Sequence, residues 1–114
     1  MITIDSLLNK LAKQEAVSFS DSIAVINSYY AYRPTRFSNG DIINEAGTNE
    51  GSCKIFAFAQ LHQLTEQQTL NLFGDYYHID VLKHPGGTNH QNIRNFMRYG
   101  WEGIEFDDNP LLKK

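Results

Sequence analysis

The sequence predicts an α+β fold, a single and mainly helical domain with a small antiparallel sheet. Three observations support this prediction. Several segments repeat apolar residues at helical spacing, residues 32–44 have the composition of a β-hairpin, and residues 44–61 contain a helix too apolar to lie at a surface. A chain of 114 residues can close one hydrophobic core but not two, so we expect one domain over residues 1–114.

Two helices are predicted at the start of the chain. Apolar residues recur at the spacing of one helix face over residues 4–14, which predicts an amphipathic helix. Ser20 and Asp21 are favourable N-cap residues, and they predict that a second helix begins there and continues toward Tyr30.

A hairpin is predicted next. Aromatic residues alternate from Tyr30, and Pro34 marks the start or the edge of a strand because proline cannot donate to a central ladder. Asn39-Gly40 is the dipeptide of a type I′ turn, and β-favouring residues flank it on both sides. The sheet is therefore built on this hairpin.

The most apolar helix is predicted to follow a loop that contains Gly47 and Gly51. Ile55, Phe56 and Phe58, with the alanine and leucine that follow, cover nearly its whole circumference. A helix of this kind is buried on most sides, so we expect it to be the central element.

Two further helices are predicted after it. The spacing from Thr65 to Gln68 fits a capping box and starts a helix that stops before residues 84–87, with Gly74 as a possible kink. Residues 88–91 repeat the same spacing, and they predict a helix that Gly100 ends. Its inward side chains are expected to be Ile93, Phe96 and Met97.

The end of the chain has a weaker pattern. Residues 101–106 alternate loosely and predict a short returning strand, and residues 107–114 are expected to form a frayed tail.

Composition excludes several classes of function. The net charge is −3 and the basic residues are scattered, so we expect no nucleic-acid partner and no membrane surface. No apolar run approaches the length of a transmembrane helix. The single cysteine cannot form an internal disulfide, and residues 1–14 do not have the pattern of a secretory signal, so we expect a soluble cytoplasmic protein.

Cys53 is the sharpest candidate for catalysis. It lies in the first turn of the predicted central helix, where free N–H groups and the helix dipole favour a thiolate. His90 is the candidate base, and Asn92, Asn95 or Asp107 could orient it. The alternative is that Cys53 is a small buried apolar residue, the common place of a free cysteine.

The same loop offers a candidate anion site. Its candidate residues are Asn49, Gly51, Ser52 and Lys54, with Arg94 as a further cation. The alternative is that this loop only shapes the entry to a buried helix. The histidines at positions 78, 84 and 90 match no metal-site spacing, so we expect no metal and no other cofactor.

Three sequence blocks resemble the HopJ type III effector family. They are Tyr-x-Pro-Thr-x-Phe-x-Asn-Gly at 32–40, Asn-x-Ala-Gly-x-Asn-x-Gly-Ser-Cys-Lys at 44–54, and His-Gln-Asn-Ile-Arg-Asn-Phe followed by Gly-Trp-x-Gly within 90–103. The resemblance covers about residues 19–106, the expected core of the domain. The family is named after a protein that a plant-pathogenic bacterium delivers into host cells, so the resemblance implies possible secretion into a host. It implies no established enzymatic activity.

Two hypotheses about function follow. The first is a non-enzymatic protein-interaction module with an aromatic-rich surface, a buried and inert Cys53, and an exposed apolar patch. The second is a hydrolase or transferase whose nucleophile Cys53 and base His90 meet in a cleft. We favour the first, because only its position in the sequence marks Cys53 as a nucleophile. The sequence does not define an oligomeric state.

Overall fold

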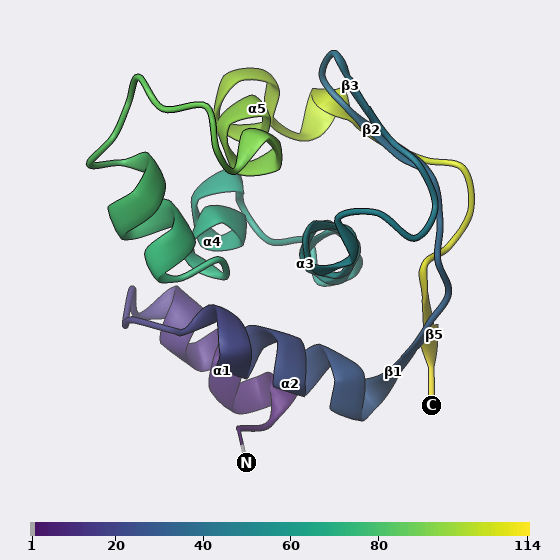
Figure 1. Cartoon of the computed structure of the whole chain (residues 1–114). Coiled ribbons are helices and arrows are strands. Elements are labelled where there is room, and N and C mark those ends of the chain that lie inside the picture. Colours follow the sequence, from purple (N-terminus) through teal and green to yellow (C-terminus); the bar gives the residue numbers. More distant parts are fainter. Residues whose placement is uncertain (1) are drawn as a thin grey trace.

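Helix α3 (Glu50–Leu61) lies at the centre of the protein, and the other elements surround it (Figure 1). The computed structural model describes residues 2–114. Six of the twelve residues of α3 are buried, including nearly all of its apolar ones, and only its last residue, Leu61, is an exposed large apolar one. The fully or almost fully buried side chains are Cys53, Ile55, Phe56, Ala57, Phe58 and Ala59.

Helices α1 (Ile4–Ala12) and α2 (Phe19–Tyr29) pack on one side of α3. The Ser18 hydroxyl accepts a hydrogen bond from the Asp21 backbone N–H, so the N-cap residue of α2 is Ser18, two residues before the predicted Ser20. The first helix is shorter than predicted, because the chain turns at Gln14, whose φ is 59°.

The predicted hairpin is present as strands β2 (Phe37–Asn39) and β3 (Ile42–Asn44). Its predicted turn type is wrong. Asn39 is the buried last residue of β2, and in the Gly40-Asp41 loop only Gly40 has a positive φ, 62°, which is typical of a type II′ turn. Strand β4 (Ile104–Phe106) pairs antiparallel with the other edge of β2, which confirms the predicted returning strand.

A second sheet joins β1 (Tyr30–Tyr32) to β5 (Leu111–Lys113) in antiparallel register. The prediction of a frayed tail is therefore wrong. The Arg33 backbone N–H donates to the Pro110 carbonyl at 2.8 Å, and Leu111 is only 2% exposed. Burial of this leucine holds the strand, and three residues are too few to give a periodic signal.

Helix α4 (Glu66–Asn71) begins with the predicted capping box of Thr65 and Gln68. It does not continue to Val81, because Gly74 adopts a φ of 61° and the chain restarts as the π-helix η1 (Tyr76–Val81). A Cβ atom at Gly74 would lie 2.9 Å from backbone atoms of residues 17 and 19, so the chain passes closely there.

Helix α5 (Gln91–Tyr99) leads into the short 3₁₀-helix η2 (Gly100–Gly103). The second predicted capping box is wrong, because His90 is the N-cap residue and makes no side-chain capping bond. Met97 is 45% exposed, so its predicted inward orientation is also wrong, whereas Ile93 and Phe96 are buried as predicted.

Candidate functional site

Five of the predicted site residues line one cleft between the first turns of α3 and α5, which we call the α3/α5 cleft. Asn49, Gly51 and Ser52 come from the start of α3, and His90 and Asn92 come from the start of α5. The cleft has a volume of about 360 Å³. The remaining lining residues are Phe19, Ile42, Phe73, Tyr76, Gln91 and Ile93.

Helices α3 and α5 both begin at the cleft with an N-cap residue in the left-handed conformation. The N-cap residues Asn49 and His90 have left-handed backbone angles, with φ of 49° and 52°, and neither side chain caps its helix. The first helical hydrogen bonds are donated by the backbone N–H groups of Cys53 and Arg94 to the carbonyls of the N-cap residues, Asn49 and His90. The earlier backbone N–H groups of each helix therefore have no helical acceptor, which gives this end of both helices partial positive charge.

A network of four asparagine side chains, of which Asn39, Asn44 and Asn92 are buried and Asn49 is exposed, lies at the cleft. Asn92 Nδ2 donates to Asn44 Oδ1 at 2.9 Å, and Asn44 Nδ2 donates back to Asn92 Oδ1 at 3.1 Å. Asn39 Nδ2 also donates to Asn92 Oδ1 at 3.0 Å, and Asn49 Nδ2 donates to Asn44 Oδ1 at 2.7 Å. The Asn44 and Asn92 oxygens receive only N–H groups, and the Asn39 and Asn49 amides donate to them, so the network fixes the orientation of all four amides.

His90 is held by contacts on two sides. Its Nε2 lies 3.1 Å from Asp80 Oδ2 of η1, and its ring lies 5.0 Å from the Tyr76 ring, centre to centre, at an angle of 33°. Phe19 packs edge-on against Tyr76 at 5.1 Å. These contacts form one aromatic wall along the cleft.

Cys53 does not line the cleft, although Ser52 does. Its side chain is completely buried, with Sγ 3.9 Å from the Thr35 carbonyl oxygen. Burial raises the pKa of the Cys53 thiol to about 11, although the nearby Tyr32 hydroxyl opposes this shift. The expected thiolate is therefore absent at neutral pH, because desolvation outweighs the helix dipole.

Lys54 and Arg94 also lie outside the cleft and have other partners. Lys54 Nζ donates to Asn27 Oδ1 at 3.0 Å and lies 4.8 Å from the centre of the Tyr32 ring. The Arg94 guanidinium donates to backbone carbonyls of residues 80, 84, 85 and 89, so it holds the loop between η1 and α5. The predicted anion site therefore lacks both of its cations.

Residues 2–114 contain no group of three or more histidine, cysteine, aspartate or glutamate side chains arranged to hold a metal ion. Within the same range, no helix has the length and apolar character needed to span a bilayer.

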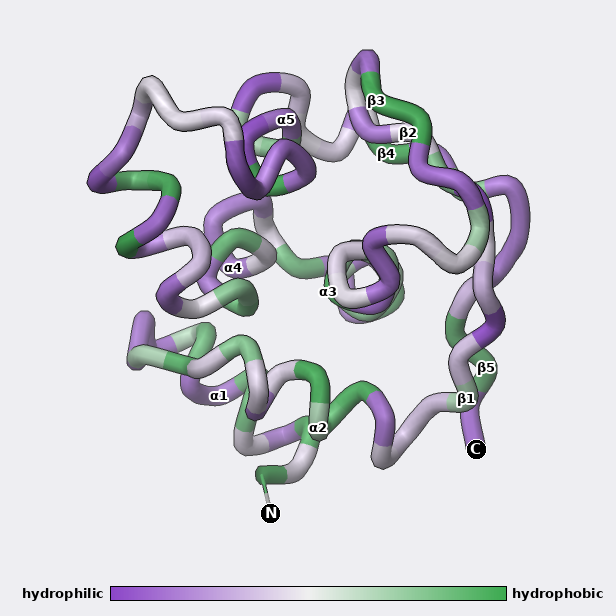
Figure 2. Tube along the Cα trace, in the orientation of Figure 1, coloured by the Kyte–Doolittle hydropathy of each residue, from purple (hydrophilic) through white to green (hydrophobic). Residues whose placement is uncertain are grey.

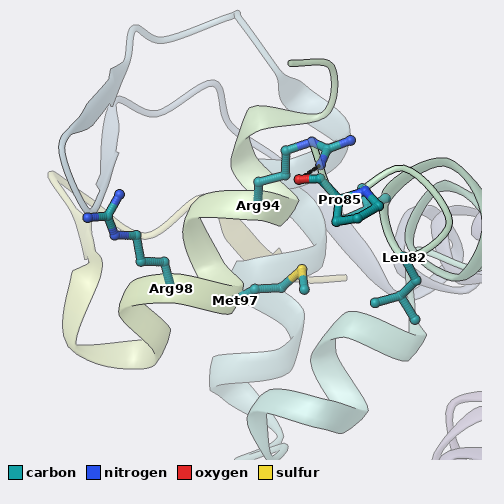
Figure 3. Close-up of a pocket in the computed structure, with 6 residues that line it drawn as sticks. Leu82, Pro85, Arg94, Met97 and Arg98 are labelled. Atoms are coloured by element: carbon teal, nitrogen blue, oxygen red, sulfur yellow. Dashed lines mark hydrogen bonds between the residues drawn. The ribbon is translucent and has the colours of Figure 1, made fainter. Parts of the chain in front are cut away.

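The protein also has an apolar groove between η1 and α5, which was not predicted from the sequence (Figure 3). We call it the Leu82–Met97 groove. It has a volume of about 290 Å³, and its lining residues are Val81, Leu82, Pro85, Arg94, Met97 and Arg98. Hydrophobic positions on outward turns of η1 are visible in Figure 2 at the left edge of the molecule. The groove was not predicted because Met97, which lines it, was expected to lie in the core.

A family model described as "HopJ type III effector protein" matches residues 4–111. The chain belongs to the HopJ family. It is also similar to the crystal structure of VPA0580, described as a protein of unknown function, with a TM-score of 0.95 and 46% sequence identity. That match covers 97% of this chain and 93% of the other. None of the curated proteins matches the chain significantly.

The three blocks that resemble the HopJ family come together at the asparagine network. Asn39 belongs to the first block, Asn44 and Asn49 to the second, and Asn92 to the third. In this HopJ protein, the blocks thus build a joint between the hairpin and the starts of α3 and α5, with the cleft above it.

Proposed function

We propose that this HopJ family member is a protein-interaction module that binds a segment of a partner protein in the Leu82–Met97 groove. One observation carries the proposal, the combination of exposed apolar side chains with an unpaired arginine in a single hollow. The segment that fits presents an apolar side chain next to a carboxylate.

The apolar part of the groove supplies the anchor. Leu82 and Met97 are each 45% exposed, and they extend from η1 and α5 into the same space beside Pro85 (Figure 3). Ile79, on the same π-helix, is 41% exposed. Exposed apolar side chains gathered in one hollow are typical of interaction sites, and methionine adapts to irregular partners.

The charged part of the groove selects the partner. Arg94 donates to backbone carbonyls, whereas Arg98 makes no ion pair or hydrogen bond with residues 2–114, and its guanidinium lies 5.4 Å from the centre of the Tyr99 ring. Lys83 and His84 are exposed in the loop that precedes Pro85. The charged residues that line the groove are all cationic although the chain carries −3, which favours an acidic segment.

The buried state of Cys53 supports an interaction module rather than a hydrolase. A completely buried thiol with a pKa of about 11 offers no nucleophile to a substrate. Delivery into a host, implied by the family name, would make a host protein the partner.

The proposal is tested by selecting peptides from a random displayed library on the folded protein. We expect the selected peptides to share a large apolar residue next to Asp or Glu. Arg98→Glu should shift the acidic position toward Lys or Arg, because it reverses the charge at the groove. The matched control Lys113→Glu makes the same charge change on the distant strand β5 and should leave the selected motif unchanged.

Two outcomes would overturn the proposal. One is a selected motif that does not respond to Arg98→Glu or to Met97→Ser. The other is self-association through the same surface, observed as a dimer in light scattering that Met97→Asp converts to a monomer.

A further inference from the structure

We propose that the α3/α5 cleft is a second binding site, and that it takes an uncharged, ring-shaped polyhydroxy ligand, a hexopyranose unit. The site is separate from the Leu82–Met97 groove and does not depend on the function proposed for that groove. Three features of the cleft support this ligand: the aromatic wall, the unpaired polar atoms, and a lining without lysine, arginine, aspartate or glutamate side chains.

The aromatic wall supplies a surface for the ring of a sugar. Tyr76 is 43% exposed, and its ring is fixed by Phe19 on its edge and by His90 across its face. Phe73 extends the wall toward the core and stacks on Phe19 at 6.2 Å. An aromatic ring that is partly exposed and held from two sides can pack against the C–H face of a pyranose without losing much side-chain entropy.

The cleft also contains polar side-chain atoms that have no partner within residues 2–114. They include Asn49 Oδ1 and Gln91 Oε1, because the side-chain hydrogen bonds of both residues use only their amide nitrogens. The Ser52 hydroxyl and His90 Nδ1 likewise make no hydrogen bond to described residues. When Nε2–H donates to Asp80, His90 Nδ1 is an acceptor.

These atoms suit a ligand rich in hydroxyl groups. Three of them accept hydrogen bonds and the serine hydroxyl can both donate and accept. A sugar hydroxyl can donate to one neighbour and accept from another, so adjacent hydroxyls on one ring can satisfy such a mixed set.

The charge of the cleft argues against an ionic ligand. Lysine, arginine, aspartate and glutamate are all missing from the residues that line it, and the nearest carboxylate contact described there, that of Asp80, is to His90. The free backbone N–H groups at the starts of α3 and α5 attract negative partial charge, which the oxygen of a neutral hydroxyl group supplies. A full anion would also meet the amide oxygens of Asn49 and Gln91, and a cation would find no carboxylate along the lining. A neutral polar molecule avoids both costs.

The cleft is also large enough and preorganised. Its volume of about 360 Å³ falls within the range of roughly 300–1,000 Å³ that is usual for small-ligand sites. The amide network holds Asn49 and Asn92 in fixed orientations before any ligand arrives. Preorganisation of this kind lowers the entropy that binding must overcome.

The test is a titration of the ¹⁵N-labelled protein with glucose, galactose, mannose, fucose and N-acetylglucosamine, followed by two-dimensional NMR. We expect at least one sugar to produce saturable shifts at millimolar concentration, centred on the backbone amides of residues 51, 52, 91 and 92. Lactose, cellobiose and chitobiose form the second arm. Tighter binding of a disaccharide than of its monosaccharide would identify the natural ligand as a glycan end, and equal binding would identify a free sugar.

Variants distinguish stacking in the cleft from nonspecific contact. Tyr76→Ala should weaken binding by about tenfold because it removes the stacking surface. Tyr29→Ala changes an equally exposed tyrosine at the end of α2, away from the cleft, and should leave the affinity unchanged. Gln91→Ala, at an exposed position on the cleft, provides a second variant if Tyr76→Ala alters the fold. Arg98→Glu should not affect sugar binding.

The proposal is overturned if no sugar of either arm gives saturable shifts at the cleft. Saturable shifts there with inorganic phosphate, and none with sugars, would also overturn it and would assign the cleft to anions. Sugar binding that Tyr76→Ala and Gln91→Ala leave unchanged would place the ligand elsewhere.

Discussion

Asn92→Ala removes the buried side chain through which α5 binds Asn39 and Asn44 of the hairpin, and the cost in stability follows from the hydrogen bonds that are lost. Asn44 Nδ2 donates only to Asn92 Oδ1, so the substitution leaves this buried donor without a partner. A buried group left unpaired costs about 1–3 kcal/mol. Two other atoms of the network keep partners, because Asn39 Nδ2 still donates to the carbonyl of residue 92 and Asn44 Oδ1 still accepts from Asn49. The buried Asn39 Oδ1 has no hydrogen-bond partner among the described residues before or after the substitution, so it does not add to the cost.

The small cavity left by the amide adds about 1 kcal/mol, so the free energy of unfolding should fall by about 2–4 kcal/mol. For a domain of this size the melting temperature should drop by about 10 °C. Urea unfolding followed by circular dichroism measures the first quantity, and a thermal scan measures the second.

Asn9→Ala is the matched control. Asn9 is exposed on α1, and its side chain makes no hydrogen bond to the described residues, so the change should lie within about 0.5 kcal/mol of zero. A loss below about 1 kcal/mol for Asn92→Ala would refute the reasoning, because it would mean that the network contributes little beyond hydration.

Three further predictions concern other parts of the molecule. With a pKa of about 11, Cys53 should be thiolate in only about 1 molecule in 1,000 at pH 8. Because the side chain is also completely buried, iodoacetamide should label it only as fast as the protein unfolds. Rapid labelling of the folded protein would contradict its burial. Gly74→Ala should lower the free energy of unfolding, measured by urea, by about 2 kcal/mol or more, because a Cβ atom would lie 2.9 Å from backbone atoms. Gly86→Ala is the control and should change this free energy little, because no atom of a non-adjacent described residue lies within 4 Å of a Cβ atom there. Burial lowers the pKa of His62 below its ordinary value of 6.5, so the stability due to neutral His62 is present above pH 6.5 and is lost as the pH falls. His62→Gln should therefore reduce the loss of stability on the acid side. A dependence of stability on pH that His62→Gln leaves unchanged would contradict a role for His62.

The parts of the fold that sequence could predict are those with long or strongly apolar patterns. The central helix was predicted because apolar residues surround it, and the hairpin because a turn dipeptide lies between β-favouring residues. Strand β5 escaped prediction because its three residues are held by long-range pairing with β1 rather than by a local pattern. The π-helix escaped because Gly74 both ends one helix and permits another to start.

The candidate site shows a similar limit. The sequence marked the loop before α3 and the start of α5 as candidate segments and named both Ser52 and Cys53, but it could not say which of the two side chains lines a cleft. Successive side chains on a helix point about 100° apart, so Ser52 faces the cleft while Cys53 faces the core. Only the packing of surrounding elements decides which of the two is exposed to a ligand.

The pairing of β1 with β5 has a consequence for synthesis of the protein. The partner residues lie about 80 positions apart along the chain, so β1 emerges from the ribosome long before the strand that covers it. Closing so large a loop is slow, and it delays completion of the fold. Until then the Tyr30–Tyr32 strand presents an uncovered, aromatic-rich edge to other nascent chains. Chaperone dependence during expression should therefore be greatest before residues 111–113 are made, and slower translation upstream of them should increase aggregation.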